Sequence, residues 1–138
     1  MVALTIPAAS VRLISGPDAP DQVSGEAFIA GAQLYQAVSG QWFKAKASGT
    51  VDEVGANNTG IALATADAAG ARVSVALPGA IVQLGTGTAG VVYAIGAVAG
   101  QLVPMADLVA TNRVHPVAVG IGLNQVQLAR NYNAGAVL

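Results

Sequence analysis

His115 is the only histidine in the sequence, and it stands directly before Pro116. A histidine is the side chain that most readily exchanges protons near neutral pH, so it is the first candidate for acid–base chemistry. One imidazole cannot form a metal site that needs two or three of them. A serine triad would need a G-x-S-x-G turn, which the sequence lacks. We therefore expect His115 to be a strand or turn residue, and we predict no catalytic residue.

The carboxylates form two close pairs, Asp18 with Asp21 and Asp52 with Glu53. Two carboxyl groups can hydrolyse a glycoside when they face each other across a cleft. Neighbouring residues at a strand end point to opposite sides instead, so Asp52 and Glu53 do not fit that chemistry. Both pairs are expected in solvated loops, and no metal site is predicted. Weak calcium binding by Asp18 and Asp21 is the alternative.

A glycine-rich segment, Gly85 to Gly90, matches the dinucleotide pattern G-x-G-x-x-G and is followed by Asp107. That chemistry requires a helix whose N-terminus meets the pyrophosphate. The next residues, 91–96, are rich in valine and favour a strand. The segment is therefore expected to be a glycine-rich hairpin loop, and no cofactor is predicted.

Charge is scarce along the whole chain. Only 9% of the 138 residues are charged, 54% are hydrophobic and the net charge is −1, whereas about 25% charged residues is typical of soluble domains. A surface with so little charge is poorly protected against association, so we expect self-association or burial in a larger assembly. Because there is no cysteine, disulfides and thiolate metal sites are excluded.

The basic residues are too scattered to form the positive stripe that nucleic-acid binding requires. They are Arg12, Lys44, Lys46, Arg72, Arg113 and Arg130. The uncharged stretch 73–106 is long enough to span a membrane, but prolines and glycines interrupt it repeatedly. The N-terminus has no basic leader, so no signal peptide is expected. The sequence thus predicts neither a nucleic-acid nor a membrane partner.

Short apolar runs alternate with turn residues at the spacing of sandwiches and barrels. At this length we expect a single β domain over residues 1–138, with residues 1–20 a possible edge strand or arm and loop. The predicted fold class is all-β, a jelly-roll-like β-sandwich or a small β-barrel of short antiparallel strands. The expected strands are 2–6, 11–14, 26–30, 33–38, 41–47, 61–64, 72–77, 81–84, 91–95, 101–105, 114–121 and 125–129, with one short helix over 104–109.

The strand expected over residues 41–47 alternates in character. Period-2 geometry places Trp42, Lys44 and Lys46 on one face and the residues between them on the other. One face is expected to be buried and the other partly solvated. Residues 15–20 contain too many turn formers to continue a regular element, so the segments before them, 2–6 and 11–14, are expected to be edge strands.

Three segments resemble small capsid decoration, or cement, proteins of tailed bacteriophages. They are Gly31–Tyr35 (G-x-x-L-Y), Trp42–Ala47 (W-x-K-A-x-A) and Gly60–Ala64 (G-I-A-L-A), within a likeness covering residues 20–125. The resemblance implies a structural, non-enzymatic protein on the outer capsid surface of the virion. It also implies a dimer or trimer that clamps neighbouring major capsid protein subunits.

The residues expected to contact other proteins are those of the N-terminal strand and of the face around Trp42: Val2, Leu4, Ile6, Trp42, Lys44 and Lys46. Edge strands and small side chains suit strand addition and flat, repeated contacts. Two alternatives stay open, a β module of a viral fibre or tail appendage and a β-barrel that binds a small apolar ligand.

Overall fold

The computed structural model describes residues 4–48, 58–108, 113–114, 116–128 and 136–137. Within these ranges every long element is a strand, and none of the helices described is long and apolar enough to cross a membrane. The strands are β1 (Arg12–Ser15), β2 (Asp18–Val23), β3 (Gln33–Gln36), β4 (Trp42–Lys44), β5 (Thr59–Ala62), β6 (Arg72–Ala76), β7 (Ile81–Gln83), β8 (Val92–Ile95), β9 (Leu102–Pro104), β10 (Arg113–Val114), β11 (Pro116–Gly122), β12 (Gln125–Leu128) and β13 (Ala136–Val137), with 3₁₀ turns η1 (Ala8–Ser10) and η2 (Met105–Asp107).

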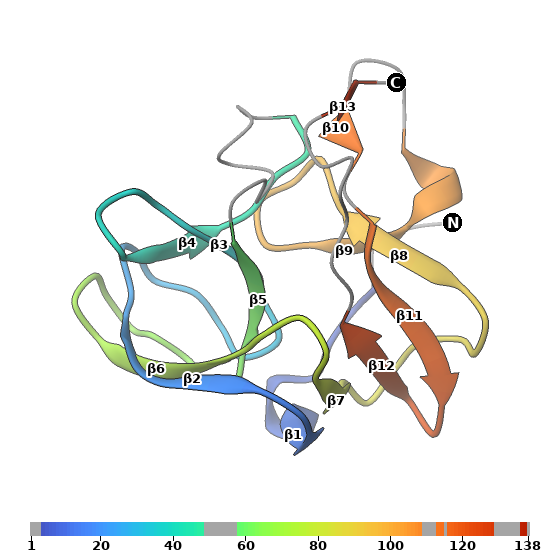
Figure 1. Ribbon diagram of the computed structural model, residues 1–138, viewed down its shortest axis with the longest axis horizontal. Helices are drawn as coiled ribbons and strands as arrows, with labels where there is room; N and C mark the ends of the chain where they lie inside the picture. The colour runs from blue at the N-terminus through green and yellow to red at the C-terminus, as the bar shows by residue number, and fades with distance from the viewer. Residues whose placement is uncertain (1–3, 49–57, 109–112, 115, 129–135, 138) are drawn as a thin grey trace.

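Two antiparallel sheets form the body of the molecule. The five-stranded sheet has the order β2-β6-β5-β3-β4 and the six-stranded sheet the order β1-β7-β12-β11-β8-β9. Figure 1 shows the first on the left and the second on the right. The sheets pack against each other, which confirms the all-β fold predicted from the alternating apolar runs. The finer expectation of a jelly roll stays a prediction.

The five-stranded sheet curls until its two ends meet. Ser24, which follows β2 at one end, forms a parallel bridge with Trp42 of β4 at the other. The Gly25 N–H donates to the Trp42 carbonyl at 2.8 Å, and the Trp42 Nε1–H donates to Gln22 Oε1 at 3.0 Å. Closure of this kind removes exposed sheet edges, where unpaired backbone groups would attract other strands.

The curled sheet has a buried cluster on each face. Inside the curl lie Phe28, Leu34, Trp42 and two valines, Val73 and Val75, with three alanines. The opposite face packs Ile61 and its neighbours against the six-stranded sheet in a larger cluster. Strand β5 is therefore buried along its whole length. Both faces of the sheet are therefore covered by packed side chains.

The N-terminal residues differ from the expected strand. Residues 4–7 are not in a strand, and one backbone bond, from Leu4 N–H to the Leu102 carbonyl at 2.9 Å, joins them to β9. Leu4 and Ile6 are partly buried against the larger cluster. The segment leads from β9 to β1, which are the two edges of the six-stranded sheet. It therefore covers core side chains instead of extending as a free arm. The expected edge position of 11–14 is confirmed in β1.

Three further expectations are wrong for reasons of topology. Residues 18–23 form β2 although Pro20 lies within it; an edge strand tolerates a proline, and a register shift between Ala19 and Gln22 accommodates Asp21 at φ 55°. Residues 26–30 form no strand, because only Phe28 makes a bridge, to Ala66. The glycine-rich segment 85–90 is not a hairpin loop, since β12 and β11 separate β7 from β8.

Candidate protein-binding groove

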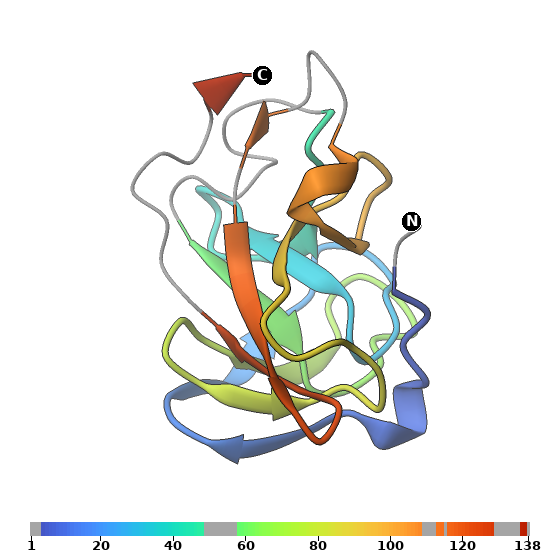
Figure 2. The same ribbon diagram turned by 90° about the vertical axis from the view of Figure 1, so that its right-hand side faces the viewer.

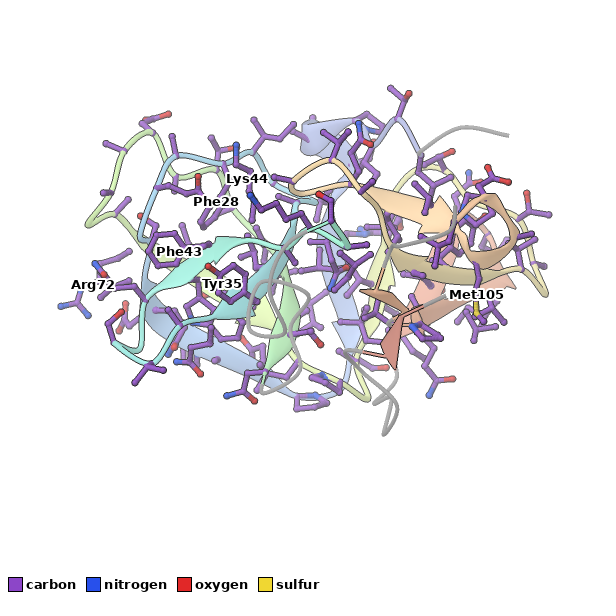
Figure 3. All side chains as sticks on the ribbon, turned by 90° about the horizontal axis from the view of Figure 1, so that it is seen from above. Phe28, Tyr35, Phe43, Lys44, Arg72 and Met105 are labelled. Carbon is purple, nitrogen blue, oxygen red and sulfur yellow. The ribbon has the colours of Figure 1, made fainter. Side chains whose placement is uncertain are left out.

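An open groove of about 670 Å³ lies between the N-terminal segment, the 27–32 loop, residues 65–67 and the β8–β9 loop. Its apolar lining is supplied by Leu4, Ile6, Phe28, Ile29 and Leu102, and two charged side chains, Lys44 and Asp67, line it as well. Figure 3 shows Phe28 and Lys44 on the same side of the molecule, over the five-stranded sheet.

Backbone pairing fixes one wall of the groove. Phe28 and Ala66 exchange two backbone hydrogen bonds, at 3.0 and 2.8 Å. Next to them, the Thr65 hydroxyl accepts a hydrogen bond from the Ala30 N–H at 3.1 Å. Phe28 turns into the core and is 5% exposed, which leaves its neighbour Ile29 60% exposed at the groove. The loop thus presents one large aliphatic side chain from a fixed backbone.

The N-terminal segment supplies the opposite wall through a close contact with the loop. A Cβ on Gly31 would lie 2.7 Å from Ile6 Cγ2, and Gly31 has a φ of +92°. Both the close approach and the left-handed backbone require glycine here. Gly31 therefore lets Ile6 pack directly on the loop.

Lys44 closes one side of the groove and belongs to the edge strand β4. Its backbone N–H donates to Glu26 Oε2 at 2.9 Å, so a side chain satisfies the outer edge of β4. Its aliphatic stem packs over Gly100, where an added Cβ would lie 3.2 Å from Lys44 Cδ. Lys44 thereby covers apolar surface with its stem.

The structure brings three of the predicted contact residues together. Leu4, Ile6 and Lys44 come from segments about forty residues apart in the sequence and line the same groove. Lys46 is half-buried and does not line it. Val2 lies outside the described residues.

Trp42 does not lie on an exposed face, and that expectation is wrong. Its side chain is 1% exposed and packs inside the curled sheet with Leu34 and Val75. Alternation along β4 holds as predicted, but Ser24 and Gly25 cover Trp42 from the strand edge. The aromatic pair that remains partly accessible is Tyr35 and Phe43, whose stacked rings have centroids 5.8 Å apart.

The candidates for chemistry are not assembled into a site in the part of the chain that the structure describes. Asp18 and Asp21 are exposed on β2 instead of lying in a loop. His115, Asp52 and Glu53 lie outside the described residues. Among those that are described, no group of three or more histidine, aspartate or glutamate side chains could hold a metal ion.

Sequence reasoning missed one strongly exposed apolar turn among the described residues. Strands β11 and β12 are joined by Leu123 and Asn124, both with positive φ, and Leu123 is 87% exposed. Asn124 signals the turn, but Leu123 carries no such signal. Ile29 and Asp67 were also missed, because the groove assembles only when distant loops meet.

No protein-family model, curated protein or solved structure matches this chain.

Proposed function

We propose that this protein is a structural component that decorates and stabilises the capsid of a tailed bacteriophage. In this proposal it oligomerises on the outer surface of the virion and bridges neighbouring major capsid protein subunits. The resemblance of Gly31–Tyr35, Trp42–Ala47 and Gly60–Ala64 to decoration proteins suggests the setting. The physical properties of the exterior support a protein that works through protein contacts.

The observation that carries the proposal is the exposed apolar surface. Eight large hydrophobic side chains are exposed among the described residues of a chain in which only 9% of residues are charged. Four of them, Val38, Leu123, Ile29 and Val98, are each at least 60% exposed and lie in loops or hairpin turns. Burial of such side chains favours association by about 1.5–3 kcal/mol each when it is complete.

A protein that binds only the assembled shell lowers the free energy of that shell by mass action. Because a capsid repeats the same contacts over its surface, an oligomer can bind several subunits at once, and weak individual contacts then suffice. The rigid, closed sheets suit this role, since little conformational entropy is lost when a preorganised surface binds.

Co-sedimentation of the purified chain with empty tailed-phage heads tests this proposal. We expect saturable binding to assembled heads and much weaker binding to unassembled major capsid protein. Heads of a phage with an unrelated shell lattice provide the control for nonspecific adhesion. Equal binding to both kinds of head, or no binding to either, would refute the capsid assignment.

The size of the groove supports a second candidate, a protein that binds a small apolar ligand. A volume of about 670 Å³ lies within the ~300–1,000 Å³ range of ligand sites. Native mass spectrometry of the purified chain decides between the candidates. A stoichiometric small molecule that disappears in an Ile29→Lys variant would favour ligand binding.

A further inference from the structure

The β11–β12 turn combines two properties that are unfavourable in an isolated molecule. Leu123 has a φ of 55°, a left-handed conformation that Asn or Gly adopts more easily, and its side chain is 87% exposed. Ile121, two residues before it, is 43% exposed. Neither the backbone strain nor the exposure stabilises the monomer, so an outlier of this kind suggests a function.

The turn is held in place from below. The Asn124 carbonyl accepts hydrogen bonds from the Leu84 N–H at 3.0 Å and from the Gly85 N–H at 3.3 Å. Pairing of Val126 with Gly120 and of Gln125 with Gly122 fixes the base of the hairpin. The exposed Leu123 side chain, called the knob below, is therefore preorganised. Little further ordering is needed for it to bind.

The knob cannot fill the groove of its own chain. Figure 1 shows the β11–β12 turn at the lower right, at the end of the six-stranded sheet. The groove residues Phe28 and Lys44 lie in the other half of the molecule, over the five-stranded sheet (Figure 3). Figure 2 shows the turn at the lower end of the molecule. Contact between knob and groove therefore needs two copies.

The two surfaces match in chemistry. Residues 116–128 carry no charge, so the knob brings none against Lys44 or Asp67 of the groove. The amides of Asn124 and Gln125 beside the knob can accept from an ammonium group and donate to a carboxylate. The aliphatic side chains of Ile121 and Leu123 can pack on the apolar lining supplied by Ile6, Ile29 and Leu102.

We propose that the Leu123 turn of one copy inserts into the groove of a second copy, and that this contact builds the oligomer. The inference rests on the proposed function, because it names the surface through which the decorating protein associates. A contact between two different surfaces closes into a reciprocal dimer or a ring when the rotation between copies allows it, and otherwise continues as an open filament.

Three variants test the contact by sedimentation velocity. Leu123→Asn suits the left-handed turn and removes the knob, so it should weaken self-association at least about tenfold, as expected for a central apolar anchor, without lowering the melting temperature. Ile29→Lys places a charge in the apolar groove and should weaken self-association to a similar extent. Val38→Asn, at the exposed tip of the β3–β4 hairpin, is the matched control and should associate like the wild type.

Mixing the two interface variants gives the sharpest result. Leu123→Asn keeps an intact groove and Ile29→Lys an intact knob, so each alone should be monomeric while their mixture forms a 1:1 heterodimer. If Leu123→Asn self-associates as strongly as the wild type, or if the mixture stays monomeric, the inference is overturned. Head binding of the wild type is measured separately. If the wild type binds heads but Leu123→Asn still self-associates like the wild type, only this interface is rejected. If Leu123→Asn is monomeric but the wild type does not bind heads, only the proposed function is rejected.

Discussion

Trp42 is the only tryptophan of the chain, and its burial makes it an internal reporter of folding. A quencher dissolved in water cannot reach a side chain that is 1% exposed. We predict that acrylamide quenches the fluorescence of the folded protein far less than that of the denatured chain. Equal quenching in both states would contradict the burial and restore Trp42 as a surface contact.

The hydrogen bond between Trp42 and Gln22 is worth testing because it joins the two ends of the curled sheet. Trp42→Phe removes the indole N–H and leaves a small cavity, so the free energy of unfolding should fall by about 2 kcal/mol. Gln22→Ala should cost about 1 kcal/mol. Denaturant unfolding of both single variants and the double variant measures the coupling, and strictly additive losses would show that the bond does not hold the sheet closed.

The left-handed conformation of Leu123 should lower the free energy of unfolding of the monomer. A left-handed conformation costs most residues about 1–2 kcal/mol, and asparagine tolerates it better. Leu123→Asn is therefore expected to raise the free energy of unfolding by about 1 kcal/mol, measured in urea at a concentration where the protein is monomeric. A lower stability would mean that Leu123 packs within its own chain.

At the scale of elements, the edge of β4 depends on one side chain. Glu26 Oε2 accepts from the Lys44 N–H, and Glu26→Ala would leave that donor without a protein partner. Amide hydrogen exchange should show faster exchange at Lys44 and a loss of about 1 kcal/mol in stability. Glu26→Gln keeps an acceptor oxygen and should retain most of the protection. Unchanged exchange in Glu26→Ala would exclude this role.

The N-terminal segment is part of the fold as well as of the groove. Since Leu4 and Ile6 are partly buried against the larger cluster, deleting residues 1–7 should lower the free energy of unfolding by about 2 kcal/mol. This differs from the behaviour of a free attachment arm, whose loss would leave the isolated fold unchanged. Thermal unfolding of the truncated chain distinguishes the two, and an unaltered melting temperature would support the free arm.

Local signals in the sequence predicted several elements well. Ser39-Gly40 marks the β3–β4 hairpin, where Gly40 has a φ of 90°, and the alternation of residues 41–47 placed Trp42 opposite Phe43 correctly. What failed depended on distant partners. Trp42 was assigned to the surface because the sequence does not show that Ser24 returns to β4. Phe28 suggested a strand because it is apolar, whereas it forms a single bridge with Ala66 and packs into the buried cluster.

At the scale of the whole molecule, the order of strands explains why the groove could not be predicted. Its walls come from residues 4–6, 27–32, 65–67 and 99–102, and only non-local pairing brings them together. Leu4, Ile6 and Lys44 were predicted as contact residues for separate reasons, the first two as an N-terminal strand and the third as part of an exposed face. The neighbouring Ile29 and the distant Leu123 gave no comparable signal.

Capsid stabilisation makes a prediction at the same scale. If the chain binds only assembled heads, a free concentration 100 times the dissociation constant stabilises each site by about 2.7 kcal/mol. Differential scanning calorimetry should therefore show heads disassembling at a higher temperature in the presence of the protein. No shift with the wild type would argue against a stabilising role.

We propose that the weakly charged exterior, with its exposed apolar turns, makes this protein associate with copies of itself and with other proteins. Sedimentation velocity of the wild-type chain over a range of concentrations up to millimolar tests it most directly. We predict a concentration-dependent shift from monomer to a defined dimer or trimer. A strictly monomeric species over the whole range would contradict the claim.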